Sequence, residues 1–311
     1  MNSIINFHVV SDPCWFERIL LVLKSKYQMV SADRIADFLS GNDQSNNLCH
    51  ITVDDGDISF YKNIYPVLIK HKVPATLFVS PKICEEKRNF WFQEMMGYDP
   101  VQLKLIFTDV SGIPYSSIKE YTVETILKSQ PINQILAIIK RYQIITNTPV
   151  KQPQNMSVGQ LIEVSKSNLV SVGAHTINHP ILKNENDINS SYEISESVNH
   201  LSNILQTKIK YFAYPNGIRH FDFSEREEAT LSEAGIQLAF TTEARNLLLS
   251  DARFRVPRIC ISDGESMLYF KAKLLMGARW YSFKRLRKNG EYQQRSRLKA
   301  LQKNLKPANV V

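Results

Sequence analysis

Two short stretches of this 311-residue chain carry side chains that could bind a metal ion. Asp54 and Asp55 are adjacent, and Gly56 after them allows a sharp turn. His175 and His179 are four residues apart, a spacing at which both imidazoles can face one point. Two adjacent carboxylates repel each other unless a cation lies beside them. One carboxylate with two imidazoles would suit a divalent ion, and the second carboxylate would remain available as a base.

Each stretch also has a simpler structural interpretation. Asp-Asp-Gly is a common turn signal, and a lone histidine is more often a core or surface residue. The second stretch has no His-Glu-x-x-His sequence, so the glutamate base of zinc peptidases is missing. Taken together, three protein ligands would leave a coordination position open for water, whose pKa falls to about 7 on zinc. Asp54 could then take a proton from that water, which is the chemistry of metal-assisted acyl hydrolysis.

An α/β fold is expected to position these side chains. Helical patterns at 15–25, 31–39 and 60–71 alternate with short apolar runs. We expect the strands at 4–10, 51–53, 75–79, 169–174, 208–213, 237–241 and 255–261. Strands separated by helices predict a parallel sheet, and about seven such units favour a barrel. Both candidate stretches follow a predicted strand, and functional residues of such folds gather at the carboxyl ends of strands.

The stretch from about residue 85 to 155 breaks this alternation. Helical patterns recur near 100–108, 117–128 and 131–142, which predicts a mostly helical insertion. It could form a packing layer or a wall of a substrate groove.

Three ordered blocks resemble the polysaccharide deacetylase family, also called the NodB homology family or carbohydrate esterase family 4. Residues 51–79, ITVDDGDISFYKNIYPVLIKHKVPATLFV, are similar to the first block of that family. GAHTINHPIL is similar to the second block, and KYFAYPNG to a variant form of the third. Their order and spacing agree, and the resemblance covers residues 4–262 with the insertion intervening.

The resemblance implies a distorted (β/α)7-type barrel over residues 1–265, with the helical insertion between the first and second motifs. It also implies a metal-dependent hydrolase that removes acetyl groups from a carbohydrate, such as a glycan containing N-acetylhexosamine. Carried over by position, Asp54 is the general base, and Asp55, His175 and His179 hold the metal. Zn²⁺ is the expected ion.

The third block departs from the family pattern. Its usual arginine, which braces the base, is replaced by Ala213, and its tyrosine by Asn216. We expect Arg258 in the segment FRVPRICI to take over the bracing role, with Arg255 as the alternative. The backbone N–H of Asn216 is expected to stabilise the oxyanion.

Other polar residues near the motifs need separate interpretations. Tyr214, next to the oxyanion segment, is expected near the substrate. The family's late Leu-His element, which supplies the general acid, is not visible, and His8 in INFHVV resembles a first-strand histidine that replaces it in part of the family. Without the family, His8 would be interpreted as a buried structural residue. Asp57 is expected to cap the next helix. The remaining histidines are expected to be structural or exposed: His50, His71, His200 and His220.

Charge is distributed unevenly along the chain. The formal net charge is +8, and the segment from Lys271 onwards contains twelve Lys or Arg and only one acid, Glu291. The tail therefore carries +11 and everything before it about −3, so we expect no nucleic-acid binding. Residues 266–311 are expected to form a basic amphipathic tail. Such a tail is either a solvated helix or a segment that contacts an anionic membrane surface or an acidic polymer.

The N-terminal residues do not form a basic region followed by an apolar run, so no secretory signal is expected. The four cysteines (Cys14, Cys49, Cys84 and Cys260) are far apart and form no C-x-x-C pair, which indicates reduced, packed thiols. We therefore expect a cytoplasmic protein, peripheral at the inner membrane face if the tail binds lipid.

Two other functions fit the same residues. One is a non-catalytic glycan-binding module on a deacetylase scaffold, which the altered third block would allow. The other is an O-acetyl esterase or an amidase that uses the same metal site.

Overall fold

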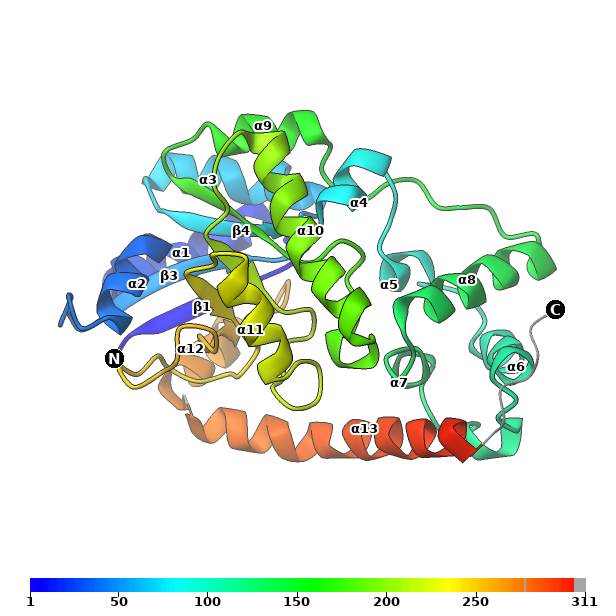
Figure 1. Ribbon diagram of the computed structural model, residues 1–311. Coiled ribbons are helices and arrows are strands. Elements are labelled where there is room, and N and C mark those ends of the chain that lie inside the picture. Colours follow the sequence, from blue (N-terminus) through cyan, green and yellow to red (C-terminus); the bar gives the residue numbers. More distant parts are fainter. Residues whose placement is uncertain (277, 305–311) are drawn as a thin grey trace. The chain divides into compact units, whose positions relative to one another are not determined.

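The computed structural model describes residues 1–276 and 278–304. A parallel β-sheet forms the centre of one of its two units, which comprises Met1–Arg88 and Gln154–Phe283 (Figure 1). The strands are β1 (Ser3–Phe7), β2 (Gln28–Met29), β3 (Leu48–Val53), β4 (Ala75–Val79), β5 (Val170–Ala174), β6 (Tyr211–Ala213), β7 (Leu238–Phe240) and β8 (Ile259–Cys260). Their order in the sheet is β7-β6-β5-β4-β3-β1-β8, with β2 beside β3. Phe240 at the end of β7 also pairs with Val256, just before β8. The sheet therefore curls into the distorted barrel that the sequence predicts.

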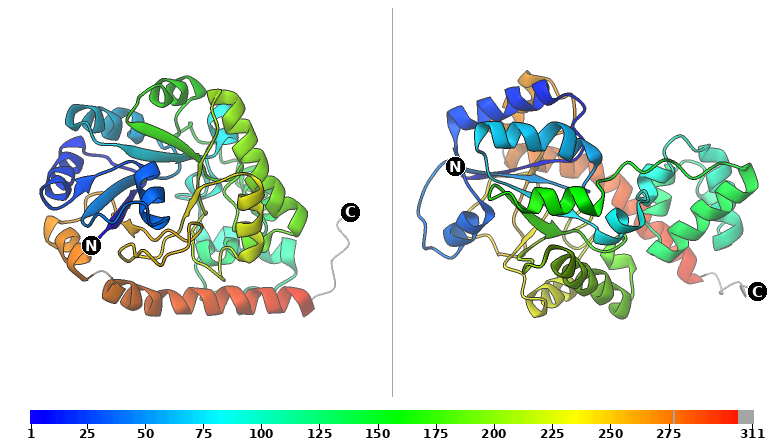
Figure 2. Two further views of the ribbon diagram at one scale, coloured as in Figure 1. Left: turned by 60° about the vertical axis from the view of Figure 1, so that its left-hand side comes forward. Right: turned by 90° about the horizontal axis from the view of Figure 1, so that it is seen from above.

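Helices surround these strands (Figure 2). They are α1 (Pro13–Lys26), α2 (Ala32–Leu39), η1 (Phe60–Ile64), α3 (Tyr65–His71), α4 (Pro81–Glu86), α9 (Val158–Ser165), η3 (Leu182–Asn184), α10 (Asp187–Leu205), α11 (Glu225–Glu233) and α12 (Met267–Met276). All residues of β1, β3 and β4 are buried, as expected for parallel strands covered on both faces. Among the described residues, no helix combines the length and hydropathy that a membrane span requires.

Local sequence signals explain where several helices begin. The Asp12 side chain accepts a hydrogen bond from the Cys14 N–H and Pro13 follows it, so α1 begins there. The predicted helix over 60–71 starts as a π-helical turn, in which the Tyr65 N–H bonds to the Phe60 carbonyl. Pro66 has no N–H to offer the preceding turn, which accounts for this wider turn.

The insertion forms a helical unit of its own, comprising Asn89–Pro153 and the described chain from Lys284. Its helices are α5 (Trp91–Glu94), α6 (Pro100–Ser111), η2 (Tyr115–Ser117), α7 (Val123–Leu127) and α8 (Ile132–Thr146), and α13 (Ala278–Asn304) crosses the boundary. The helix predicted over 117–128 is confined to α7, because the Thr122 side chain caps a new helix by accepting from the Thr125 N–H. A separate apolar core, which includes Ile106, Phe107 and Ile135, stabilises this unit.

The C-terminal segment is divided differently from the expected tail at 266–311. Phe270 and Leu274 of α12 lie in the core of the barrel unit, which extends to Phe283. Leu298 of α13 is fully buried in the core of the helical unit. The segment therefore contributes apolar residues to two separate hydrophobic cores.

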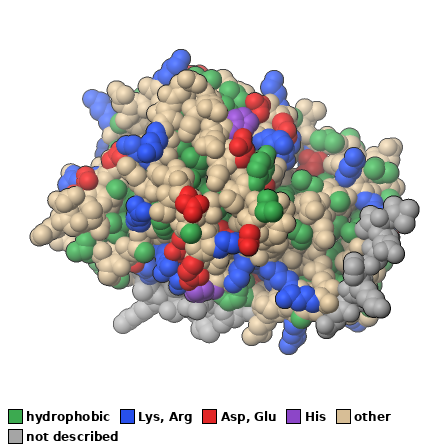
Figure 3. All heavy atoms as spheres, in the orientation of Figure 1, with side chains coloured by type: hydrophobic (Ala, Val, Ile, Leu, Met, Phe, Trp, Pro, Cys, Tyr) green, Lys and Arg blue, Asp and Glu red, His purple; other side chains and the backbone are tan. Residues whose placement is uncertain are grey.

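The surface carries charges of both signs. On the face seen in Figure 3, acidic and basic side chains of the described residues are interspersed.

His50 on β3 provides a test of stability against pH. Its side chain is fully buried, with Nδ1 2.7 Å from the Val30 carbonyl oxygen and Nε2 2.9 Å from the Thr76 hydroxyl. Burial lowers the pKa of His50 from 6.5 to about 4. The unfolded chain binds this proton more readily, so stability is lost as pH falls from 6.5 towards 4.

We expect acidification from pH 7 to pH 5 to lower the free energy of unfolding by about 2 kcal/mol through His50 alone. Denaturant titrations at several pH values measure this loss. His50→Gln should flatten the dependence, because glutamine has no group that titrates in this range. Parallel curves for the wild type and His50→Gln would contradict the assignment.

Candidate active site

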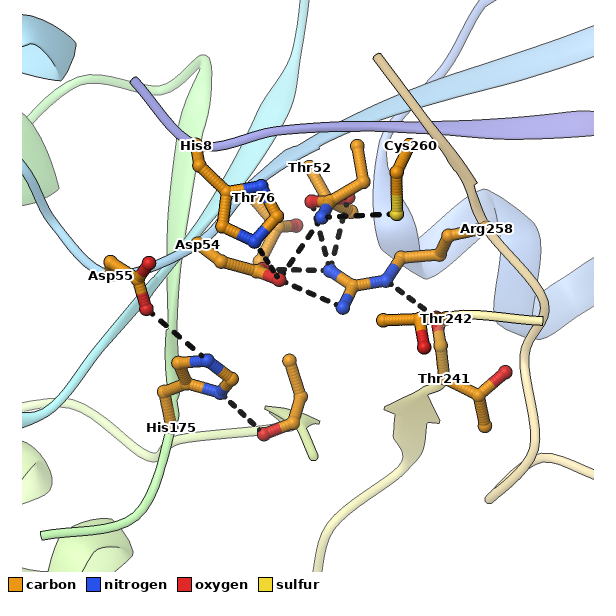
Figure 4. Close-up of polar contacts among 12 residues, drawn as sticks. His8, Thr52, Asp54, Asp55, Thr76, His175, Thr241, Thr242, Arg258 and Cys260 are labelled. Atoms are coloured by element: carbon orange, nitrogen blue, oxygen red, sulfur yellow. Dashed lines mark hydrogen bonds and ion pairs between the residues drawn. The ribbon is translucent and has the colours of Figure 1, made fainter. Parts of the chain in front are cut away.

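The predicted catalytic residues converge at the carboxyl ends of the strands. Phe7 of β1 is in register with Val53 of β3, so His8 and Asp54 follow neighbouring strands at the same level. Val79 of β4 is in register with Ala174 of β5, and His175 comes next. The two distant stretches of sequence therefore meet at one end of the barrel (Figure 4).

Asp55, His175 and His179 form a buried group with the donor set of a metal site. One ligand atom of each lies within 4.8 Å of the others. Asp55 Oδ1 is 3.5 Å from His175 Nε2 and 3.6 Å from His179 Nε2. This oxygen is buried and has no hydrogen-bond partner within the described part of the chain, so it suits a cation.

The electrostatic surroundings of Asp55 and the tautomer of His175 are both compatible with a metal ion bound between them. Burial, together with the charges of Asp54 and Asp57, raises the pKa of Asp55 well above 3.8. No Lys or Arg lies within ion-pair distance of Asp55 among the described residues. A bound cation would therefore offset the free-energy cost of keeping the buried Asp55 carboxylate ionised. His175 Nδ1 lies 2.6 Å from the Ala213 carbonyl oxygen, and donation there leaves Nε2 free to bind a metal. Burial lowers the pKa of His175 to about 4, which keeps the imidazole neutral.

The loop that carries His175 and His179 has an unusual backbone conformation. Thr176 and His179 adopt positive φ angles of 64° and 58°, which are uncommon for such residues. Ser80 Oγ donates to the His175 carbonyl oxygen over 2.9 Å, and the His179 N–H donates to Thr176 Oγ1 over 3.0 Å. These contacts fix the direction of both imidazoles.

Glu193 on α10 supports the same loop, and sequence reasoning did not identify it. Its side chain is buried, and Oε2 accepts the backbone N–H groups of Ile177 and Asn178, each over 2.9 Å. Oε1 accepts the Asn178 side-chain amide over 2.6 Å. Glu193 lies on α10, outside the motif that contains the two histidines, so the motif by itself does not indicate this contact.

Glu193→Ala is expected to weaken metal affinity by about ten- to a hundredfold, because the loop between the two predicted ligands, His175 and His179, loses its hydrogen-bond acceptor. Titration calorimetry with Zn²⁺ on metal-stripped protein measures this. Glu193→Gln keeps a carbonyl oxygen for the two N–H groups and should retain most of the affinity. Wild-type affinity in the alanine variant would show that the loop does not need Glu193.

Arg258 holds the Asp54 carboxylate by a bidentate ion pair. Nη1 lies 2.7 Å from Oδ1 and Nη2 lies 2.9 Å from Oδ2. Arg258 is fully buried, and its Nε donates to the Thr241 carbonyl oxygen over 2.9 Å. The alternative candidate, Arg255, instead pairs with Glu228 over 2.7 and 2.8 Å. The arginine missing at position 213 is thus replaced from the segment that closes the barrel.

The ion pair determines the protonation state of Asp54. Burial by itself would raise its pKa, but the positive charge of the Arg258 guanidinium, which hydrogen-bonds to both carboxylate oxygens, outweighs burial. The pKa of Asp54 is therefore held well below 3.8, and the carboxylate stays ionised at neutral pH.

Asn6 links these groups and was also missed. Its Nδ2 donates to Asp54 Oδ2 over 3.0 Å, while its Oδ1 accepts from Arg258 Nη1 over 3.0 Å and from the Thr52 hydroxyl over 2.8 Å. Asn6 and His8 are two residues apart at the end of a strand, and side chains at that spacing share a face. This pair of polar residues in an apolar run was the available signal.

His8 and Asp57 lie near the base in different roles. His8 Nε2 is 3.7 Å from Asp54 Oδ2, and its side chain is 44% exposed, so solvent and ligands can reach it. Asp57 accepts the Ser59 N–H over 2.8 Å at the start of the next helix, which is the expected capping contact.

The third motif shows one departure from the predicted roles. Asn216 follows β6 with a φ of 59°, and its N–H donates to no other group of the described chain. Tyr214 is buried in the core, stacked on Phe223, and its hydroxyl donates to the Phe254 carbonyl oxygen over 3.2 Å. The expected substrate contact of Tyr214 is therefore wrong, because its side chain points into the core.

Comparison with known proteins agrees with this geometry. The family model described as "Polysaccharide deacetylase" matches residues 41–109 and 114–239, more than half of the chain. The chain belongs to the polysaccharide deacetylase family. It is accordingly an enzyme of the polysaccharide deacetylase class, with a donor set compatible with the metal dependence of that family. No curated protein sequence matches it.

Several solved structures of deacetylases share the fold. Deacetylase PplD of Streptococcus pyogenes, in complex with acetate, has 18% identity and a TM-score of 0.59, with 89% of this chain and 97% of that chain covered. IcaB from Ammonifex degensii has 20% identity and a TM-score of 0.57, covering 84% and 92%. A de-N-acetylase from Aggregatibacter actinomycetemcomitans has 16% identity and a TM-score of 0.56, covering 87% and 98%. This deacetylase thus has the barrel architecture of those enzymes.

Proposed function

We propose that this polysaccharide deacetylase removes N-acetyl groups from a glycan containing N-acetylhexosamine. The observation that carries the proposal is the pairing of an ionised, braced carboxylate at Asp54 with the adjacent metal-ligand group of Asp55, His175 and His179. A divalent metal in that group, by our proposal Zn²⁺, would lower the pKa of water and polarise the acetyl carbonyl.

The side chains around this group supply the remaining chemistry. Asp54 removes a proton from the attacking water, and Arg258 keeps Asp54 ionised so that it can do so. The Asn216 N–H donates to the oxyanion that forms on the former carbonyl oxygen. His8, in its protonated form, gives a proton to the leaving amine as the C–N bond breaks. Acetate and the free amine are the products.

An acetate-release screen tests the proposal. Metal-stripped protein is reloaded with Zn²⁺, Co²⁺, Mn²⁺ or Ni²⁺ and incubated with N-acetylglucosamine oligomers and with O-acetylated xylan. We expect metal-dependent acetate release from the N-acetylated substrates. Faster release from the O-acetylated polymer would identify an esterase instead. Bound metal without acetate release from any acetylated substrate would favour a glycan-binding module.

We also propose a cytoplasmic location, with the basic C-terminal segment in contact with an anionic membrane surface. The uneven charge supports this, because residues from Lys271 onwards carry +11 and the preceding chain about −3. Fractionation of cells that express the full chain tests the location. Recovery from the periplasm or the medium would contradict it.

A further inference from the structure

Helix α12 is apolar on its inner and its outer face. Phe270 and Leu274 point inward and are buried in the core of the barrel unit. Leu268 and Leu275 point outward, with exposed fractions of 82% and 76%. A helix on a protein surface normally carries polar residues on its outer face. The outer face of α12 therefore lacks the composition of a solvated surface.

The neighbours of these leucines extend the apolar surface. Tyr269 and Met276 on α12 are also exposed, at 42% and 43%. Of the two lysines of α12, Lys271 is exposed, whereas Lys273 is buried and bonds to Glu265 and to the Cys260 carbonyl oxygen. One lysine is thus the only charged side chain of α12 that solvent reaches.

The sequence that continues from this face is basic and aromatic. Residues 271–290 contain seven Lys or Arg and no Asp or Glu. Trp280, Tyr281 and Phe283 occur among these basic residues. Apolar and aromatic residues combined with Lys and Arg are typical of helices that lie in the interface of a membrane. The absence of acids favours a negatively charged partner over a neutral one.

We propose that the outer face of α12, formed by Leu268, Tyr269, Leu275 and Met276, docks onto an anionic lipid membrane. This surface rests on the membrane contact proposed above, which it makes specific, and it does not depend on the identity of the sugar. The exposed leucines enter the boundary between head groups and acyl chains, and the basic residues that follow attract the anionic head groups.

Flotation of the full chain with vesicles tests this surface. Vesicles of phosphatidylcholine with phosphatidylglycerol should bind the protein, vesicles of phosphatidylcholine alone should bind it much less, and high salt should weaken the binding. The double variant Leu268→Ser/Leu275→Ser should bind anionic vesicles roughly tenfold more weakly. A matched double variant on α10, Ile188→Ser/Tyr192→Ser, removes exposed apolar residues elsewhere and should bind as the wild type does.

Two further readouts distinguish membrane docking by α12 from a role in catalysis and from self-association. Acetate release from soluble oligomers should be unchanged in the α12 variant, so a failure of the proposed catalysis would appear separately. Sedimentation velocity reports whether the same face holds a second copy of the chain. Wild-type flotation of the α12 variant, absence of flotation by the full chain, or conversion of a dimer to a monomer by the variant would each overturn the proposal.

Discussion

Asp54→Asn is expected to reduce the rate of acetate release by about a thousandfold while leaving metal affinity near the wild-type value. The amide cannot accept a proton from water, yet it occupies nearly the same volume beside Arg258. The proposed metal ligands Asp55, His175 and His179 are unchanged in this variant. Steady-state kinetics, together with Zn²⁺ titration of the same preparation, measures both quantities.

Asp57→Asn is a matched control for this change. Asp57 is another buried carboxylate of the same turn, and its contact with the Ser59 N–H can also be made by asparagine. This control should keep most of the activity. Near-normal acetate release by Asp54→Asn would show that Asp54 is not the base. Loss of metal from Asp54→Asn would instead place Asp54 among the ligands.

Arg258→Met is expected to lower the free energy of unfolding by about 3–5 kcal/mol, because it leaves the buried Asp54 carboxylate without its cation. Both side chains are almost inaccessible to solvent, at 0% for Arg258 and 3% for Asp54, so water cannot replace the lost contacts. Urea denaturation measures the loss. The double variant Asp54→Leu/Arg258→Met should recover part of it, since neither charge remains buried.

The activity of Arg258→Met should also depend differently on pH. Without the guanidinium, burial raises the pKa of Asp54, so its base form is lost at a higher pH than in the wild type. The acid limb of the kcat/KM profile is therefore expected to move upward. Arg255→Met is the control, because its partly exposed pair with Glu228 is worth less than about 1 kcal/mol. Equal losses of stability in the two variants would refute the special role of Arg258.

Local features of the sequence were sufficient to predict seven of the eight strands and the residues of the proposed metal site, whereas the two-residue strand β2 was not predicted. Strand periodicity depends on residues next to each other in the chain, and the two motifs each fit within a single loop. Both loops follow strands, and parallel strands bring their carboxyl ends to one edge, so the meeting of Asp54 and His175 followed from topology. The predicted start of α7 at residue 117 was wrong, because the Thr122 side chain caps a helix that begins at Val123.

Only the tertiary structure decided the contacts between groups far apart in sequence. The sequence left Arg255 and Arg258 both open, and packing placed Arg258 on Asp54, 204 residues away. Asn6 and Glu193 reach the site by side chains whose direction depends on strand register and helix placement, which no single segment encodes. Packing also decided which apolar residues of the C-terminal segment are buried, because each is buried only where a complementary core exists. Residue types and short spacings therefore determined the chemistry available to this protein, and three-dimensional packing selected the side chains that support it.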